Sequence, residues 1–259
     1  MKFTSLTANL LLVATTALAS PLSARKQAAM DALRARRSFR RSNNTAGTAD
    51  ATSPNWAGVA ISQTGVTEVS GTFTVPQPKL PAGGDPSVSY CGVAWVGIDG
   101  WTNGDLIQTG VLWCITEGET FWDPWYEYLP GAITIYEGVT VSAGSVVTVT
   151  ATKTGTNSGV TTLTVDGITV SHTFTGENFS LPGTSAEWIV EDYEYSVAGP
   201  PFVPFADFGS VTFTGATAVV NGATITPGEG NWVIIDLERS NSSITSSSFS
   251  GSTVTINYL

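Results

Sequence analysis

The sequence predicts an all-β protein in which two antiparallel sheets pack together as a β-sandwich. From residue 55 onward, helical periodicity is almost absent. Short runs rich in Val, Ile, Thr and aromatic residues recur instead, and Gly, Pro, Asn and Ser separate them. The number and spacing of these runs are typical of a two-sheet sandwich, and about 205 residues fit a single all-β domain.

Two segments precede this domain. Residues 1–19 combine a basic start with an apolar run and small residues at Ala17 and Ala19, which predicts a signal peptide and a secreted protein. We interpret residues 20–53 as a basic propeptide and linker that inhibits the domain at neutral pH and leaves when carboxylates protonate. A basic helix can instead bind nucleic acid or a membrane surface. Its place between a signal peptide and an acidic domain favours the propeptide.

Charge separates the two parts of the chain. Residues 1–50 hold eight Lys or Arg against two Asp, whereas residues 51–259 hold three Lys or Arg against nineteen Asp or Glu. So acidic a domain repels itself near pH 7 and loses that repulsion as its carboxylates titrate, which predicts acid tolerance. Nucleic acid is excluded as a partner of this surface. No segment after the signal peptide is long and apolar enough for a membrane span, and we expect a monomer.

The domain, residues 54–259, divides into runs with strand character. Asp166-Gly167 and Asn221-Gly222 each stand between two such runs and indicate hairpin turns. The proline-rich residues 76–86 form a loop. The sequons at Asn43, Asn178 and Asn241 are typical of a secreted glycoprotein. The expected strands are 55–62, 66–75, 93–98, 106–113, 120–128, 132–136, 145–152, 159–165, 168–174, 186–195, 210–220, 231–238, 243–249 and 252–258.

The expected strands 93–98 and 106–113 form one hairpin around a Gly- and Asn-containing tip. If the arms pair so that partner numbers sum to 205, the only two cysteines, Cys91 and Cys114, fall opposite each other. A disulfide can span such a pair. In this register Gln108 lies opposite Gly97, and we expect the missing side chain to let another molecule approach the glutamine. A sandwich strand that tolerates one glutamine is the alternative.

The available chemistry is narrow. The one histidine, His172, lies in an alternating run typical of a plain strand, so neither a zinc site nor a Ser-His-Asp triad is expected. We expect no metal and no cofactor. Carboxylates, amides and aromatics remain. The period of two puts Asp123, Trp125 and Glu127 on one strand face, and Glu187 and Glu191 on another.

Several separated motifs together resemble the glutamic peptidases, or eqolisins, from residue 55 to the C-terminus. They are AWVGIDG (94–100), LIQTG (106–110), WYEYLPG (125–131), AEWIVEDYE (186–194) and PFADFGSVTFTGA (204–216). The resemblance implies a secreted, acid-active endopeptidase made as a preproprotein. It also implies a sandwich of the concanavalin-like or jelly-roll type, with about seven strands per sheet. Protein and peptide substrates, and the chain's own propeptide as inhibitor, are the implied partners.

Matched motif by motif, the resemblance places the catalytic dyad on Gln108 and Glu191. Other active-site positions of the family fall on Trp95, Asp99, Asp123, Trp125 and Glu127. The tryptophans are expected to line the substrate cleft, and the three acids are expected to orient the dyad.

Two other classes of function remain open at this point. A sandwich glycoside hydrolase needs two carboxyls about 5 to 5.5 Å apart. Two acids four positions apart on one strand are about 13 Å apart, so a glycosidase would need a cross-strand pair. A non-catalytic carbohydrate-binding module would use exposed tryptophans such as Trp101, Trp122 and Trp125.

Overall fold

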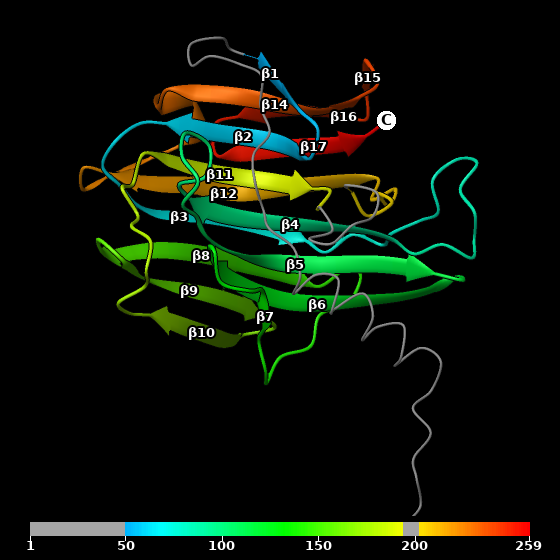
Figure 1. Cartoon of the computed structure of the whole chain (residues 1–259), viewed down its shortest axis with the longest axis horizontal. Coiled ribbons are helices and arrows are strands. Elements are labelled where there is room, and N and C mark those ends of the chain that lie inside the picture. The colour runs from blue at the N-terminus through cyan, green and yellow to red at the C-terminus, as the bar shows by residue number, and fades with distance from the viewer. Residues whose placement is uncertain (1–49, 194–201) are drawn as a thin grey trace, which may run out of the picture.

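The computed structural model describes residues 50–193 and 202–259, and these form two packed β-sheets (Figure 1). The predicted signal peptide, most of the predicted propeptide and the Asn43 sequon lie outside these residues. No helix of the described part is long and apolar enough to cross a membrane. The all-β, antiparallel sandwich predicted from the sequence is confirmed, with sheets of nine and eight strands when the shortest strands are counted.

Sheet 1 carries the predicted hairpin. Eight of its strands follow the order β1-β14-β2-β11-β4-β5-β6-β7, and β15 pairs with β14. Its strands are β1 (Asp50–Ser53), β2 (Trp56–Ser62), β4 (Tyr90–Ile98), β5 (Ile107–Thr116), β6 (Glu119–Tyr128), β7 (Thr134–Ile135), β11 (Ser185–Glu191), β14 (Trp232–Arg239) and β15 (Ser242–Ser243).

Sheet 2 covers one face of sheet 1. Its main order is β10-β9-β8-β3-β12-β17-β16, and β13 pairs with β12. Its strands are β3 (Val66–Thr74), β8 (Val146–Gly155), β9 (Ser158–Val165), β10 (Ile168–Phe174), β12 (Ser210–Val220), β13 (Ala223–Ile225), β16 (Thr245–Ser250) and β17 (Thr253–Tyr258). One short 3-10 helix, η1 (Pro227–Glu229), precedes β14.

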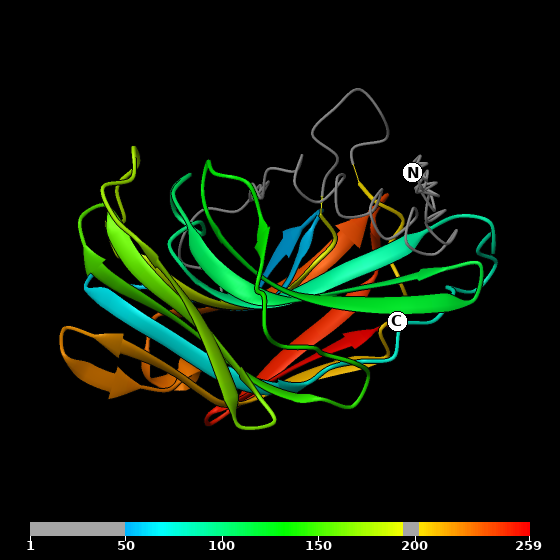
Figure 2. The same ribbon diagram turned by 90° about the horizontal axis from the view of Figure 1, so that it is seen from below.

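Strand alternation gives sheet 1 two apolar faces. Side chains such as Val96, Trp113 and Trp188 point toward sheet 2 and form the core between the sheets. Side chains one position away, such as Trp95 and Ile189, form a second buried cluster made only of sheet 1 residues and adjoining segments. We call the side that carries this second cluster the outer face of sheet 1. Figure 2 shows how strongly both sheets curve.

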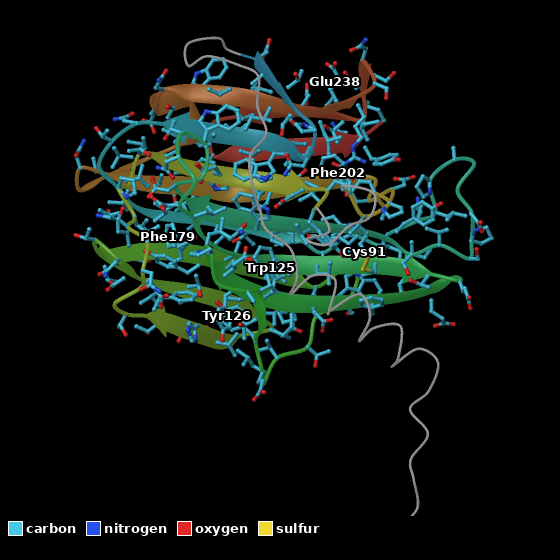
Figure 3. All side chains as sticks on the ribbon, viewed as in Figure 1. Cys91, Trp125, Tyr126, Phe179, Phe202 and Glu238 are labelled. Atoms are coloured by element: carbon cyan, nitrogen blue, oxygen red, sulfur yellow. A yellow bond between two sulfur atoms is a disulfide. The ribbon has the colours of Figure 1, made fainter. Side chains whose placement is uncertain are left out.

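The hairpin register predicted from the cysteines is confirmed. In the β4–β5 ladder Cys91 pairs with Cys114, Trp95 with Gly110 and Gly97 with Gln108. Cys91 and Cys114 form a disulfide, with their Cα atoms 4.1 Å apart. The yellow sulfur bond beside the Cys91 label in Figure 3 marks its place on the sheet.

Sheet 1 begins earlier than the sequence analysis expected. β1 lies within residues assigned to the linker, and it pairs in parallel with β14, so the sheet is not wholly antiparallel. The Ser53 side chain, at the end of β1, is buried. The Ser53 hydroxyl accepts a hydrogen bond from the Trp56 amide at 3.1 Å and so fixes the turn between β1 and β2.

Candidate active site

Six of the seven predicted site residues lie on the outer face of sheet 1. The sheet order brings their strands side by side, with β4 between β11 and β5, and β6 beside β5. Every one of these side chains is buried. Figure 3 labels one of them, Trp125, which lies on β6 beside the short edge strand β7. The six are Gln108 on β5, Glu191 on β11, Trp95 on β4, and Asp123, Trp125 and Glu127 on β6.

Gln108 is held by Glu127, its partner in the β5–β6 ladder. The Gln108 amide nitrogen Nε2 donates to Glu127 Oε2 at 2.5 Å. Because a carboxyl oxygen of Glu127 accepts this hydrogen bond, the contact fixes which way the amide faces. Gln108 Oε1 is buried and has no hydrogen-bond partner among the described residues. The amide therefore keeps one N–H and a carbonyl oxygen for a further hydrogen bond.

Glu191 is held by two neutral N–H donors, one on β4 and one in the turn between β1 and β2. Trp95 Nε1 donates to Glu191 Oε2 at 2.9 Å, and Asn55 Nδ2 donates to Glu191 Oε1 at 3.5 Å. Both donors are buried, as is Glu191 itself. Because each donor engages a different carboxylate oxygen, the head group has a fixed orientation.

The register shows how Gln108 and Glu191 are related. Gln108, Gly97 and Glu187 form one row across β5, β4 and β11, and Glu191 lies four residues farther along β11. The Trp95 indole spans this offset. Its Cζ3 atom lies only 2.9 Å from where a Cβ on Gly97 would stand, while its Nε1 reaches Glu191. The indole therefore runs from the Gln108 row to the Glu191 carboxylate.

The expected role of Gly97 is wrong in one respect. The space above this glycine is not open to another molecule, because a Cβ there would lie 2.8 Å from Leu106 Cδ1 as well as close to Trp95. The Leu106 and Trp95 side chains pack instead over the backbone of Gly97. Glycine is required because any side chain would collide with them.

Asp99 lies apart from the other six, at the tip of the hairpin. Its carboxylate accepts hydrogen bonds from the Gly183 amide at 2.8 Å, the Thr184 amide at 2.8 Å and Asn103 Nδ2 at 3.0 Å. These contacts fix the tip to the segment that precedes β11. A role of Asp99 in orienting the dyad stays a prediction.

Burial, with a smaller contribution from Asp99, raises the pKa of nearby Asp105.

Asp123 and Trp125 lie on β6 at successive outward positions. Trp125 pairs with Gly110, which pairs in turn with Trp95, so the glycine separates two tryptophans. Asp123 pairs with Leu112, in the row that leads through Val93 to Glu191. Trp125 is fully buried and Asp123 is only 7% exposed. That Trp125 lines a substrate cleft stays a prediction.

Two contributors to this site, Asn55 and Arg239, were not predicted from the sequence. Asn55, just before β2, binds Glu191. Glu187, which the sequence places on the same strand face as Glu191, lies in the Gln108 row and is fully buried, and it is not assigned a role. Arg239, at the end of β14, pairs with buried Asp192. Complete burial raises the pKa of Asp192 well above its ordinary value, and the Arg239 guanidinium opposes that shift. The single arginine in residues 51–259 was the one available signal.

The described residues include no group of three or more His, Cys, Asp or Glu side chains arranged to hold a metal ion. The polar groups that the site itself offers are the Gln108 amide, the carboxyl groups and the indole N–H of Trp95. That the protein works without a metal or cofactor stays a prediction.

Comparison with known proteins gives concordant matches. Residues 54–258 match the model of the peptidase A4 family. The chain is 36% identical over 291 residues to aspergillopepsin-2 of Aspergillus niger, covering all of both chains. It is 34% identical to scytalidopepsin B of Scytalidium lignicola, covering 91% of this chain and 88% of that one. The crystal structure of scytalido-glutamic peptidase with a transition state analog inhibitor superposes with a TM-score of 0.71 at 34% identity, covering 80% of this chain and 98% of that one.

Proposed function

The chain belongs to the peptidase A4 family of glutamic peptidases, and from this premise we propose that it is a secreted acid endopeptidase whose dyad is Gln108 and Glu191. The observation that carries the assignment is the pair of hydrogen bonds from Trp95 and Asn55 to Glu191. They hold an oriented carboxylate on the same sheet face as an amide with an unpartnered oxygen.

This arrangement suits the activation of water. Gln108 Oε1 can accept a hydrogen bond from a water molecule while Glu191 takes its proton as general base. The second N–H of Gln108 can then donate to the oxygen of the scissile carbonyl as negative charge develops there. Glu191 returns the proton to the leaving nitrogen. Glu127 keeps the amide in the orientation that both steps need.

The choice of Glu191 over Glu187 rests on contacts. Along the backbone Glu187 is the nearer of the two to Gln108, because it lies in the same row and Glu191 lies four residues farther along β11; both glutamates point to the same face. Only Glu191 is engaged by the Trp95 indole that reaches back over Gly97. Glu187 is therefore the matched control for the proposed base.

Processing and working conditions form the rest of the proposal. The signal peptide, the inhibitory basic propeptide, the monomeric state and glycosylation are inferred from the sequence. The sequon residues Asn178 and Asn241 are both exposed, which suits glycan attachment. Activity below neutral pH is supported by the excess of acidic residues in the domain. It is also supported by the dyad itself, because Glu191 is held by neutral N–H donors rather than by an ion pair.

The experiment compares three variants in cleavage of denatured casein at acid pH. We expect Gln108→Ala and Glu191→Gln to lower kcat by at least about a thousandfold, since each removes a group that acts in the transition state. Glu187→Gln should retain most of the activity. Full activity in either dyad variant would overturn the assignment, and loss confined to Glu187→Gln would move the base to that residue.

A polysaccharide arm of the same assay addresses the carbohydrate alternatives. A binding module would present its tryptophans to solvent, yet Trp101 and Trp125 are buried, and Trp122 is half-buried with its Nε1 donating to the Pro76 carbonyl at 3.0 Å. We expect no cleavage of a β-glucan under conditions where casein is degraded. Pepstatin and chelators should leave the casein cleavage unchanged.

A further inference from the structure

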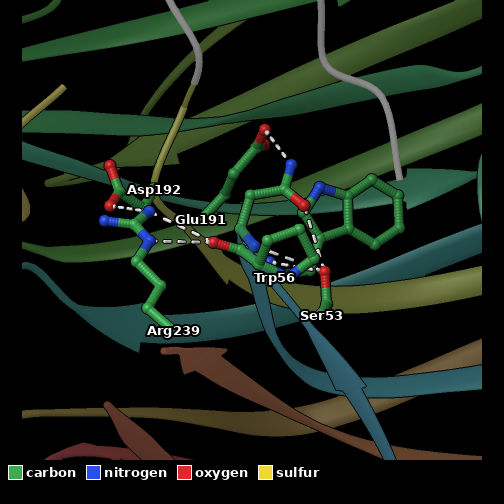
Figure 4. A network of polar contacts seen from close by, with 7 residues as sticks. Ser53, Trp56, Glu191, Asp192 and Arg239 are labelled. Atoms are coloured by element: carbon green, nitrogen blue, oxygen red, sulfur yellow. Dashed lines mark hydrogen bonds and ion pairs between the residues drawn. The ribbon is translucent and has the colours of Figure 1, made fainter. Parts of the chain in front are cut away.

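Arg239 binds the two segments that adjoin Glu191. Its Nε and Nη2 atoms donate to the Pro54 carbonyl at 3.2 and 3.1 Å, and Nη2 also donates to Asp192 Oδ2. Its guanidinium lies over the Phe202 ring, 4.1 Å from the ring centre. Figure 4 shows Arg239 beside Asp192 and Glu191, with dashed lines for these polar contacts.

Both polar partners of Arg239 act on the position of Glu191. Asp192 is the next residue in the chain, and its amide donates to the Asn55 carbonyl at 2.8 Å. Pro54 immediately precedes Asn55, whose side-chain amide donates to Glu191. Ser53 Oγ donates to Asn55 Oδ1 at 3.0 Å, which turns the Asn55 nitrogen toward the glutamate. Arg239 thus fixes both the main chain of Glu191 and the turn that carries its side-chain donor.

The chemistry of the contact favours arginine. A planar guanidinium presents several N–H groups in a fixed fork, so it can bind a carboxylate and a carbonyl together, whereas a lysine ammonium is a point charge. Asp192 is fully buried, while the Arg239 side chain keeps 29% of its surface exposed. The Pro54 carbonyl does not titrate, so this half of the contact persists in acid.

We infer that Arg239 is a positioning residue for the peptidase reaction: it holds Glu191 in place through Asp192 on one side and the Pro54–Asn55 turn on the other. This inference rests on the proposed function, because it assigns Arg239 a task only if Glu191 is the general base. Arg239 contacts neither Gln108 nor the tryptophans of the site through any described bond, and it acts on kcat rather than on substrate binding.

The test compares Arg239→Met and Arg239→Lys with the wild type on casein at acid pH. Displacing a catalytic group by about 1 Å can cost about a hundredfold in rate. We expect Arg239→Met to lower kcat by about 10- to 100-fold and to change KM by less than about threefold. Arg239→Lys keeps the positive charge but lacks the forked N–H groups, so its kcat should lie between those of Arg239→Met and the wild type. Lys79→Met, which removes an exposed cation elsewhere, should match the wild type.

A merely structural role is separated from positioning by measuring kcat per folded molecule. Near-UV circular dichroism at the assay temperature gives the folded fraction of each variant. Unchanged kcat per folded Arg239→Met molecule, beside inactive Gln108→Ala and Glu191→Gln, would overturn this inference and leave the proposed function intact. Active dyad variants would instead overturn the function.

Asp192→Asn covers the case in which Arg239→Met does not fold. It keeps the size of the side chain and the bond to Pro54, and replaces one oxygen of the carboxyl group, which accepts from Arg239, with an NH2 group that cannot accept. We expect a kcat about three- to tenfold below wild type with KM preserved, as for Arg239→Lys. Wild-type kcat in both Asp192→Asn and Arg239→Lys would contradict the positioning role.

Discussion

At the scale of single residues, Glu127 determines which way the proposed catalytic amide faces. Its carboxylate accepts from Gln108 Nε2 at 2.5 Å, and hydrogen bonds to charged groups are stronger than those between neutral groups. A carboxylate has no N–H to offer, so the opposite orientation of Gln108 would bring two acceptors together. Glu127 thereby keeps the Gln108 carbonyl oxygen directed away from β6.

Glu127→Gln should therefore weaken catalysis without removing the contact. The new amide can donate as well as accept, so Gln108 can turn over and its orientation is no longer unique. We expect kcat to fall about tenfold, the equivalent of one charge-assisted hydrogen bond. Steady-state kinetics on casein measure this. Glu119→Gln, at the exposed start of the same strand, is the control, and equal kcat in the two variants would show that the orientation does not matter.

At the scale of elements, the β4–β5 hairpin depends on Gly110 for close pairing. A Cβ at this position would lie 1.9 Å from the Ala94 carbonyl oxygen and 2.7 Å from the Trp95 Cβ. The first of these atoms belongs to the backbone and cannot turn aside. The glycine therefore sets how near β4 and Trp95 lie to β5, and through Trp95 it affects Glu191.

We predict that Gly110→Ala destabilises the protein by at least about 3 kcal/mol, because overpacking against the backbone forces the strands apart. Gly104→Ala, at the hairpin tip with no atom within 4 Å of the added Cβ, should stay within about 0.5 kcal/mol of wild type. Urea unfolding measures both. A Gly110→Ala midpoint equal to that of Gly104→Ala would mean that the hairpin tolerates wider spacing.

The sequence predicts contacts between residues that are close together in the chain, and it misses contacts between residues that are far apart in it. The hairpin register was predictable because two cysteines near each other in the chain selected one alignment, and β10 and β12 have the expected bounds. β1 was missed because its polar residues lack a strand pattern and its partner β14 lies far along the chain. The Asn55–Glu191 and Arg239–Pro54 contacts join residues 136 and 185 positions apart, and no local pattern marks them.

At the scale of the whole molecule, carboxyl groups that are wholly or partly buried suit the protein to acid. Burial is the main cause that raises the pKa of Asp192, Asp236 and Asp105. The folded state then binds more protons than the unfolded chain between the ordinary aspartate value and each raised value. The stability from these groups is fully present below the unfolded pKa of about 4 and is lost as pH rises through the folded pKa.

Two exposed carboxylates act in the opposite sense. Hydrogen bonds from the side chain and backbone of Ser87 lower the pKa of Asp85, and bonds from the backbone and side chain of Thr226 lower that of Glu229. Their stabilising effect is present above the ordinary carboxyl value and is lost as pH falls through the lowered value. Both groups are solvent-exposed, so water screens these contacts, and the wholly or partly buried Asp192, Asp236 and Asp105 dominate the balance.

We therefore predict that the free energy of unfolding is larger at pH 4 than at pH 7, and that Asp236 is responsible for a measurable part of the difference. Asp236→Asn keeps an oxygen to accept the Ser247 amide bond, 2.7 Å in the structure, but removes the titrating group. Urea unfolding of this variant should show a smaller gain between pH 7 and pH 4 than the wild type. Asp166→Asn removes the same charge from an exposed turn and should leave the gain unchanged. Because both variants change net charge equally, equal gains would assign the acid stability to general charge repulsion rather than to buried carboxylates.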